Sequence, residues 1–421
     1  MIPAAEKHCL LVDLPFSDKL DGLEHTVNNL KQKYKQLWWE TDTIFPDLAQ
    51  TYSRKRKKEI EQETNNFLEK LANHPKSKSV LEYYSDLKTQ QKSAQQVRDI
   101  ERFCKLAGLY IDKPFADGFD RSTKIFLEKI KLFDPSLGPD KIYQAMRNLW
   151  IMNSLQVLMN LEMNCSDSMF AYSMLYPYTD NINDDVSMSI DAKLSMNQSL
   201  RRWLEGDFCP YRNETERKIF LLVKMIEQEF PRSKFHGVFQ SLLAIYNAQI
   251  KSLIQHKQHG IHDESDILDI SFEKGGTSVL ADGYLIRGIL NETVEDFCFG
   301  YGAFLQFADD IQDVKDDLKN SHLTLFSQMA GKCKLDQLAN KLFNYISTIV
   351  DLHLSAPALK RLRELILNNC YFLVLETIGK NRQFYSRKYT KEIEAHFPFS
   401  FSFFDKTKKR LKLILLKADR D

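Results

Sequence analysis

The amino-acid sequence predicts an all-α fold. Glycine and proline, the residues that most often interrupt helices, number 15 and 12 in a chain of 421 residues, which is roughly half of their usual share. Between Pro231 and Pro357 there is no proline, and apolar residues there recur at helical spacing, as in the run from Phe239 to Ile250. No segment alternates apolar and polar residues over the length of a strand. We therefore expect a set of long helices.

The first part of the chain, up to about residue 105, is richer in Lys, Gln, Glu and Asn than the rest. A basic run from Arg54 to Lys58 leads directly into a Glu-rich stretch, so lysines and glutamates stand four residues apart. This spacing favours a solvated helix face over a patch that binds nucleic acid or membrane. We treat residues 1–105 as an N-terminal helical extension.

Residues 106–395 are expected to form the main helical bundle. The stretch from Leu149 to Met163 is apolar on most of its circumference, which predicts a central helix. Connections are expected at the Gly-, Pro- or polar-rich segments 112–119, 133–140, 207–213, 258–264, 331–334 and 355–357. The last segment, residues 396–421, is a basic, aromatic C-terminal tail that either packs on its own domain or rests on a membrane surface.

Charge and cysteine content bound the function. The 58 basic and 57 acidic residues give a net charge of +1, which argues against a dedicated nucleic-acid binder. No run of eighteen apolar residues predicts a membrane span, and the first thirty residues lack the pattern of a signal peptide. The seven cysteines are scattered and form no Cys-x-x-Cys pair, as is typical of reduced thiols. We expect a soluble, cytoplasmic protein.

The strongest signal for chemistry is an acidic stretch from Asp309 to Asp317, with five carboxylates in nine positions. Asp309 and Asp313 are four residues apart and so share one side of a helix. The flanking residues are apolar, and clustered anions beside a core are costly unless cations are bound. Oxygen-only ligands are those that Mg²⁺ or Mn²⁺ prefers.

A second acidic cluster precedes the first by 129 positions and runs from Thr179 to Asp185, with Asp180 and Asp184 again four residues apart. Two such faces turned toward one cavity would hold several divalent ions, which is what is needed to grip a diphosphate and stabilise it as it leaves. The alternative for this cluster is a solvated acidic helix end.

A third signal is the pair of adjacent glycines in the segment Glu273–Ser278, within a region that is otherwise helical. Each glycine inside a helix costs about 1 kcal/mol relative to alanine. The pair therefore indicates either a break in the helix or a close backbone approach, and the alternative is an ordinary loop between two helices.

These motifs resemble those of the class I isoprenoid synthases, which comprise prenyl diphosphate synthases, squalene and phytoene synthases, and class I terpene cyclases. The pattern Gly302-x-x-x-Gln306-Phe307-x-Asp309-Asp310-x-x-Asp313 resembles the second aspartate-rich motif of prenyl diphosphate synthases, and Asp180-x-x-x-Asp184 resembles the first motif of squalene and phytoene synthases. The resemblance implies a helical bundle around a central cavity. It implies these metal ligands: Asp180, Asp184, Asp309 and Asp313, with Asp185 and Asp310 as further candidates.

The resemblance also implies a basic side chain beside a kinked helix that lines the cavity, and basic groups that close over diphosphate. Arginines trail the first motif in prenyl synthases, and a late Arg-Tyr element serves terpene cyclases, although each of these residues could equally be a surface charge. The corresponding diphosphate-binding candidates are Lys274, Thr277, Arg201, Arg202, Arg387 and Tyr389, and the cavity candidates are Gly275, Gly276 and Gln306.

The places where this sequence differs from the family's motifs indicate which of the family's reactions to expect. Chain elongation requires a second diphosphate site, which in that family is a Gly-Lys-x-x-Arg element before the first motif, and this sequence lacks it. The resemblance therefore implies a single-substrate terpene synthase that uses Mg²⁺ and an allylic prenyl diphosphate. A squalene/phytoene-type or prenyl diphosphate synthase-type prenyltransferase is the alternative, and a non-catalytic helical protein that keeps the fold is the second. Whether the chain forms a homodimer stays open.

Overall fold

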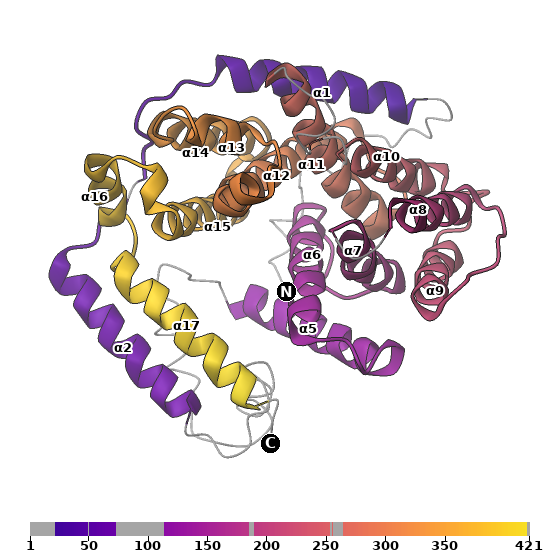
Figure 1. Ribbon diagram of the computed structural model, residues 1–421, viewed down its shortest axis with the longest axis horizontal. Helices are drawn as coiled ribbons and strands as arrows, with labels where there is room; N and C mark the ends of the chain where they lie inside the picture. The colour runs from indigo at the N-terminus through magenta and orange to yellow at the C-terminus, as the bar shows by residue number, and fades with distance from the viewer. Residues whose placement is uncertain are drawn as a thin grey trace.

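The computed structural model describes residues 22–48, 50–72, 113–184, 189–252, 255 and 264–418. In these ranges the chain forms fifteen α-helices and two short 3₁₀ helices, and no β-strand (Figure 1). The predicted all-α fold is confirmed for this part of the chain. The helices are α1 (Leu23–Glu40), α2 (Arg54–Ala72), α5 (Lys113–Phe133), α6 (Pro139–Leu158), α7 (Asp167–Asp184), α8 (Ile190–Glu205), α9 (Glu214–Glu229), α10 (His236–Ser252), α11 (Glu264–Arg287), α12 (Glu292–Asn320), α13 (Leu325–Ala330), α14 (Asp336–Leu354), η4 (Pro357–Leu359), α15 (Lys360–Lys380), η5 (Arg382–Phe384), α16 (Arg387–Ala395) and α17 (Phe401–Ala418).

The centre of the fold is the antiparallel pair α11 and α12, whose backbones meet at two glycines. A Cβ atom on Gly275 would lie 2.4 Å from the carbonyl oxygen of Gly302, and one on Gly302 would lie 2.1 Å from that of Gly275. A Cβ on Gly276 would lie 2.5 Å from the ring of Phe299. Only glycine leaves room for backbones this close.

The adjacent glycines therefore serve a close backbone approach. Helix α11 continues from Glu264 to Arg287 through both of them. The alternatives of a helix break and of a loop at Gly275–Gly276 are wrong, because the packing against α12 removes the need for either.

Helices α6, α7 and α10 surround α11 on its remaining sides (Figure 1). In α6, Leu149, Met152 and Leu158 are fully buried, which confirms the predicted central helix, although it ends at Leu158. Helix α7 runs antiparallel to α11, since the Ser168 hydroxyl donates a 2.8 Å hydrogen bond to the carbonyl of Leu285.

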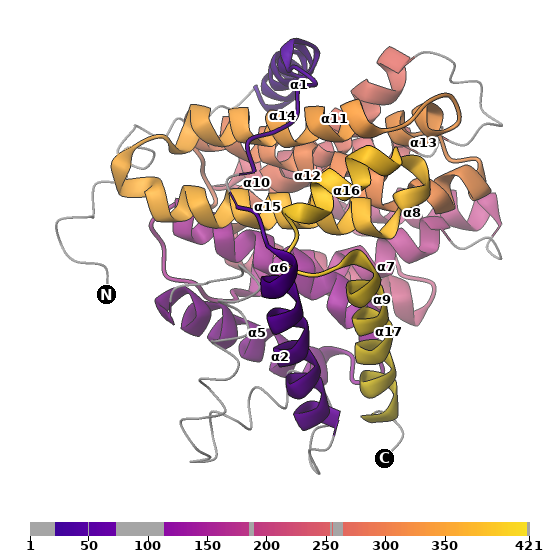
Figure 2. The ribbon, with the colours of Figure 1, turned by 90° about the vertical axis from the view of Figure 1, so that its left-hand side faces the viewer.

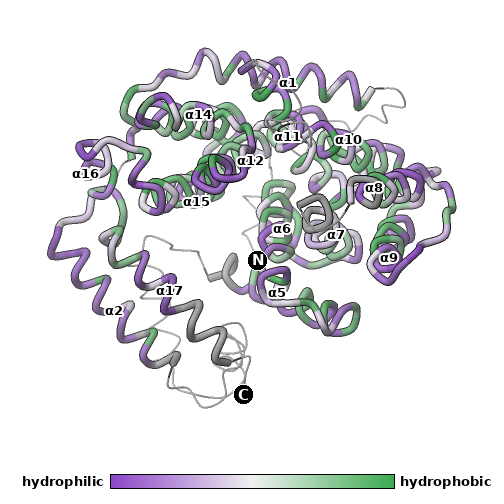
Figure 3. Tube along the Cα trace, in the orientation of Figure 1, coloured by the Kyte–Doolittle hydropathy of each residue, from purple (hydrophilic) through white to green (hydrophobic). Residues whose placement is uncertain are grey.

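The described start of the chain belongs to the same core. Helix α1 lies across α11 and α12. Its Tyr34 and Trp38 are buried, with exposed fractions of 0% and 1%. The Trp38 ring lies 4.6 Å from that of Phe307, measured between centroids. The solvent side of α1 is hydrophilic, as is most of α2 (Figure 3). Residues 22–40 of the extension are thus packed as part of the bundle.

Helix α2 lies beside α17 and apart from α11 and α12 (Figures 1 and 2). The backbone N–H of Ser400 donates a 2.7 Å hydrogen bond to Glu61. The basic run at the start of α2 is largely exposed, and Arg56 pairs with Glu59 at 3.1 Å. This is the solvated helix face that the sequence predicts.

The aromatic start of the C-terminal tail packs on its own domain. Phe397, Phe399 and Phe401 are buried, and the Phe397 ring lies 5.1 Å from that of Phe372 in α15. Of the two alternatives for the tail, packing on the domain is observed for this aromatic stretch. None of the helices in the described ranges has the length and apolar character needed to span a membrane.

Candidate metal and diphosphate site

The acidic stretch lies in the second half of α12, where the helix emerges from the core. Asp310 faces α11 and is 6% exposed. Its Oδ2 accepts a 3.1 Å hydrogen bond from the Ser271 hydroxyl, and its Oδ1 accepts one of 2.8 Å from the amide of Gln306. Gln306, expected to line the cavity, therefore holds Asp310. Ser271 carries no motif that would have revealed it in the sequence.

Asp309 and Asp313 are turned away from this buried contact and are about half exposed. Arg147 of α6 pairs with Asp309, at 3.1 Å between Nη2 and Oδ1. Lys380, the last residue of α15, has its Nζ 3.9 Å from Oδ1 of Asp313. The two expected ligands thus lie side by side, each facing a base from another helix.

Burial and mutual repulsion raise the pKa values of three carboxyl groups of α12. Burial raises the pKa of Asp310 to about 6, against the hydrogen bond from Gln306 and the charge of Lys274. Burial and the charges of Asp310 and Asp313 raise the pKa of Asp317 to about 7. Burial, then the charge of Asp309, raises the pKa of Asp313. Carboxylate oxygens are the ligands that a hard divalent cation such as Mg²⁺ prefers, and a bound cation would favour their ionised form.

Lys274 lies on α11 one turn after Ser271, where its charge acts on Asp310. Its neighbour Thr277 is buried, and its hydroxyl donates a 2.6 Å hydrogen bond to the carbonyl of Glu273. Glu273 is in turn held by Lys31 of α1, at 3.0 Å, and by Lys251 of α10. The structure therefore brings Lys274 to the acidic stretch, whereas the hydroxyl of Thr277 is used within its own helix.

The other acidic cluster lies at the end of α7. Asp180 and Asp184 are helical, but their side chains, and Asp185 as a whole, lie outside the described residues. The hydroxyls of Tyr176 and Ser278 are in contact. Because α7 and α11 are antiparallel, Asp180, one turn beyond Tyr176, comes level with Lys274, one turn before Ser278. The backbone thus brings both acidic stretches to the same end of α11.

A buried ion pair fixes α7 just before this cluster. Asp134 accepts hydrogen bonds from the Tyr178 hydroxyl and from Lys218 of α9, the latter at 2.8 Å. Burial alone would raise the pKa of Asp134, but the hydrogen bonds from Lys218, Tyr178 and Ser136 outweigh it and lower the pKa to about 2. The last turns of α7 are therefore anchored to α9 and to the end of α5.

Arg201 and Arg202 find partners on their own helix or directly after it. Arg201 pairs with Glu205 at 2.8 Å, and Arg202 donates a 3.2 Å hydrogen bond to the carbonyl of Phe208. Neither partner belongs to the acidic stretches. The expectation that these arginines grip diphosphate gains no geometric support.

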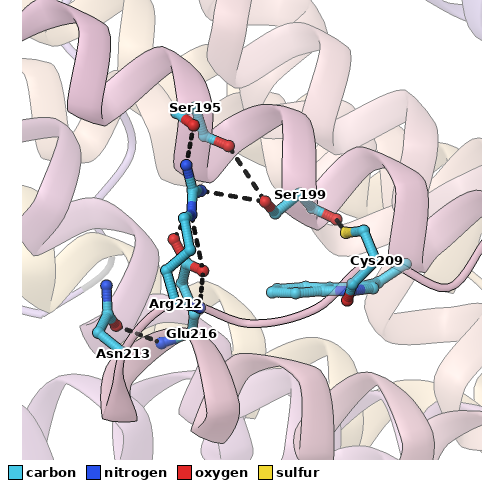
Figure 4. A network of polar contacts seen from close by, with 7 residues as sticks. Ser195, Ser199, Cys209, Arg212, Asn213 and Glu216 are labelled. Atoms are coloured by element: carbon cyan, nitrogen blue, oxygen red, sulfur yellow. Dashed lines mark hydrogen bonds and ion pairs between the residues drawn. The ribbon is translucent and has the colours of Figure 1, made fainter.

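The connection that follows α8 is held by Arg212 (Figure 4). Its Nη2 lies 3.1 Å from the hydroxyl of Ser199 and 2.7 Å from Oε1 of the buried Glu216. The indole N–H of Trp203 donates a 3.0 Å hydrogen bond to the carbonyl of Cys209. These contacts fasten α8 to α9, and thus hold the helix that follows the acidic cluster of α7.

Arg387 and Tyr389 stand at the start of α16. The Tyr389 ring is 6% exposed, and its hydroxyl donates a 2.7 Å hydrogen bond to Oδ1 of Asn340 in α14. Arg387 is exposed. Tyr389 therefore serves the packing of α16 on α14, and its hydroxyl is already engaged.

The sequence did not predict that Lys380 and Arg147 lie beside the aspartates of α12, and neither residue belongs to a motif that would have indicated it. Their pairings join residues 67 and 162 positions apart, which no local spacing encodes. The described side chains contain no group of three His, Cys, Asp or Glu residues arranged to hold a metal ion. Two of the four expected ligands, Asp180 and Asp184 of α7, have side chains outside the described ones, so this absence does not extend to them.

No protein-family model matches the chain, and no curated protein matches it.

Proposed function

We propose that the chain is a Mg²⁺-dependent class I terpene synthase, which ionises an allylic prenyl diphosphate, cyclises or rearranges the carbocation and releases diphosphate. The observation that carries the proposal is the arrival of both acidic stretches at one end of α11, level with Lys274. Two carboxylate-bearing helices on either side of a basic residue form a site suited to a metal-bound diphosphate.

The side chains have distinct roles in this proposal. Asp309 and Asp313 are half exposed and hold the metal from α12, whereas Asp180 and Asp184 hold it from α7, with Asp185 and Asp310 beside them. Magnesium, or manganese in its place, supplies positive charge that stabilises diphosphate as it leaves. Asp310 is buried and held by two hydrogen bonds, so it fixes the orientation of this turn of α12.

Basic side chains complete the charge balance. Arg147, Lys274 and Lys380 approach the aspartates from α6, α11 and α15. Once a divalent cation occupies the carboxylates, these bases become free to bind the anionic oxygens of diphosphate. We give this role to them in preference to Arg201, Arg202 and Tyr389, whose polar groups are engaged elsewhere.

A single-substrate reaction is preferred over condensation because the sequence lacks the Gly-Lys-x-x-Arg element of a second diphosphate site. The deciding experiment incubates the purified full chain with Mg²⁺ and allylic diphosphates of ten, fifteen, twenty and twenty-five carbons, each alone and with isopentenyl diphosphate. We expect diphosphate release and a hydrocarbon or alcohol product, identified by mass spectrometry, from one allylic substrate alone. Strict dependence on a second diphosphate would assign a prenyltransferase instead.

The metal assignment has its own test. Asp309→Asn keeps the shape of the side chain and removes its charge, so we expect at least a hundredfold loss of turnover with an unchanged helical circular dichroism spectrum. Glu364→Gln, an exposed site on α15, is the matched control and should keep full activity. Full turnover in Asp309→Asn would exclude it as a ligand.

The compartment and partners follow from the same proposal. We place the reaction in the cytoplasm, because the cysteines show no pairing pattern in the sequence. Exposed lysines follow the buried phenylalanines of the tail, and they provide a basic surface for peripheral contact with a membrane. An isoprenoid substrate could be taken from that membrane.

A further inference from the structure

A pocket of about 410 Å³ lies between η5, α16 and the start of α17, on the side of the molecule seen in Figure 2. None of the residues that line it belongs to α12, so it is separate from the acidic stretch. Its volume is within the range of small-molecule binding sites. Phe401 and Tyr385 provide aromatic surface in its wall.

Two buried hydrogen-bond donors in this wall have no acceptor among the described residues. Arg382 binds Oδ2 of Asp405 through Nη2 at 2.8 Å, but its buried Nη1 has no partner. The hydroxyl of Tyr385, a residue that is only 3% exposed, has none either. Burial and the charge of Asp336 raise the pKa of Tyr385, so its hydroxyl keeps the proton and stays a donor. A buried donor without an acceptor is costly, which points to an acceptor that the pocket can take up.

Two further cations line the pocket from α16. Arg387 and Lys391 are one helical turn apart and exposed, and no acidic side chain in the described ranges forms an ion pair with either. Glu394, the one carboxylate in the wall, accepts a 2.7 Å hydrogen bond from the backbone N–H of Phe401. It is therefore directed to the backbone of α17.

We propose that this pocket binds a phosphate-bearing small molecule or headgroup. Arg382 is paired with Asp405, whereas Arg387 and Lys391 have no carboxylate partner in the described ranges. Their two charges favour an anion such as a phosphate monoester, which carries about −2. The planar guanidinium of arginine fits phosphate oxygens in pairs. The unmet donors of Arg382 and Tyr385 are covered in this structure and add hydrogen bonds only when the ligand opens the wall that covers them. The aromatic wall receives the organic part of the ligand. The proposal does not depend on the reaction at the acidic stretch.

The test uses the full chain without Mg²⁺, in a chelating buffer, so that no metal-dependent site contributes. Phenyl phosphate is titrated by calorimetry into the unmodified protein, into Arg387→Gln/Lys391→Gln and into Lys388→Gln. Lys388 is exposed on the same helix but does not line the pocket, so it is the matched control. We expect the double variant to bind at least tenfold more weakly and the control to bind within twofold. All three proteins should melt at similar temperatures, because the three side chains are exposed.

A second arm separates the two sources of phosphate. Vesicles that contain phosphatidic acid are compared with vesicles of phosphatidylcholine in a sedimentation assay. Binding to phosphatidic acid that the double variant loses and the control keeps would assign a lipid headgroup. Binding of phenyl phosphate alone would assign a soluble ligand. The proposal is overturned if the unmodified protein binds neither probe, or if the double variant binds as tightly as the control.

Discussion

Asp282 of α11 is a carboxyl group with no exposed surface. Its Oδ1 accepts a 3.0 Å hydrogen bond from the amide of Asn148, and its Oδ2 has no partner among the described residues. Burial raises the pKa of Asp282 well above its usual value, and the hydrogen bond from Asn148 opposes this only in part. The group is therefore neutral in the folded protein at a pH where it is ionised in the unfolded chain.

This shift makes stability depend on pH in a defined direction. The folded state holds the proton of Asp282 more tightly than the unfolded state, so the free energy of unfolding falls as pH rises from about 4 toward the raised pKa. Asp282→Asn keeps the shape and cannot ionise. We expect it to gain stability relative to the unmodified protein between pH 5 and pH 8, by up to about 1.4 kcal/mol per pH unit.

Urea denaturation at both pH values measures this difference. Asp266→Asn, at the exposed start of the same helix, is the control, and its difference from the unmodified protein should not grow with pH. An Asp282→Asn difference that stays constant between pH 5 and pH 8 would contradict a neutral buried acid.

At the scale of elements, the contact between α11 and α12 rests on the pair Gly275 and Gly302. In the native backbone an added methyl group on Gly302 would lie 2.1 Å from the carbonyl oxygen of Gly275, a rigid atom that cannot move aside as a side chain can. Since Ser271 and Asp310 lie about one and about two turns from this contact, the spacing of the two helices also sets the geometry of the acidic stretch.

Gly302→Ala should therefore destabilise the protein by about 1–3 kcal/mol, because overpacking outweighs the gain in helix propensity. Gly331→Ala is the control: its nearest atom is at 3.9 Å and its backbone is right-handed, so its stability should change by less than about 0.5 kcal/mol. Thermal unfolding of both variants measures the difference. Equal melting temperatures would mean that the two backbones are not in contact.

At the scale of the whole molecule, α1 and the bundle share one hydrophobic core through Trp38. We expect Trp38→Ala to lower the free energy of unfolding by about 3–5 kcal/mol. We also expect α1 and the rest of the bundle to unfold together, in a single transition. Trp39→Ala, next to it and 52% exposed, is a matched control that should change stability little. Denaturant unfolding followed by far-ultraviolet circular dichroism measures both. A separate early transition in Trp38→Ala would show that α1 unfolds independently.

Local sequence patterns predicted the local structure, but they did not predict contacts between residues that are far apart in the chain. Periodicity and the low glycine and proline content predicted the helices. The adjacent glycines left three alternatives, a helix break, a close approach of backbones and a loop, and the sequence did not decide among them. The partner at that approach, Gly302, stands 27 positions away and carries no signal that pairs it with Gly275. Likewise, an Arg-Tyr pattern contains no information on burial, so it could not reveal that the Tyr389 hydroxyl binds Asn340.

The place of α1 in the core has a consequence for the order in which the protein folds. Tyr34 rests against Gly300, where a Cβ atom would lie 2.3 Å from its ring. A contact across such a span of sequence closes slowly, because the chain loses much entropy in bringing its ends together. During synthesis α1 (Leu23–Glu40) leaves the ribosome before α11 and α12, so its contact surface on them is completed only when Asn320 has been made. The apolar side of α1 therefore stays uncovered while the helices between α1 and α11 are made.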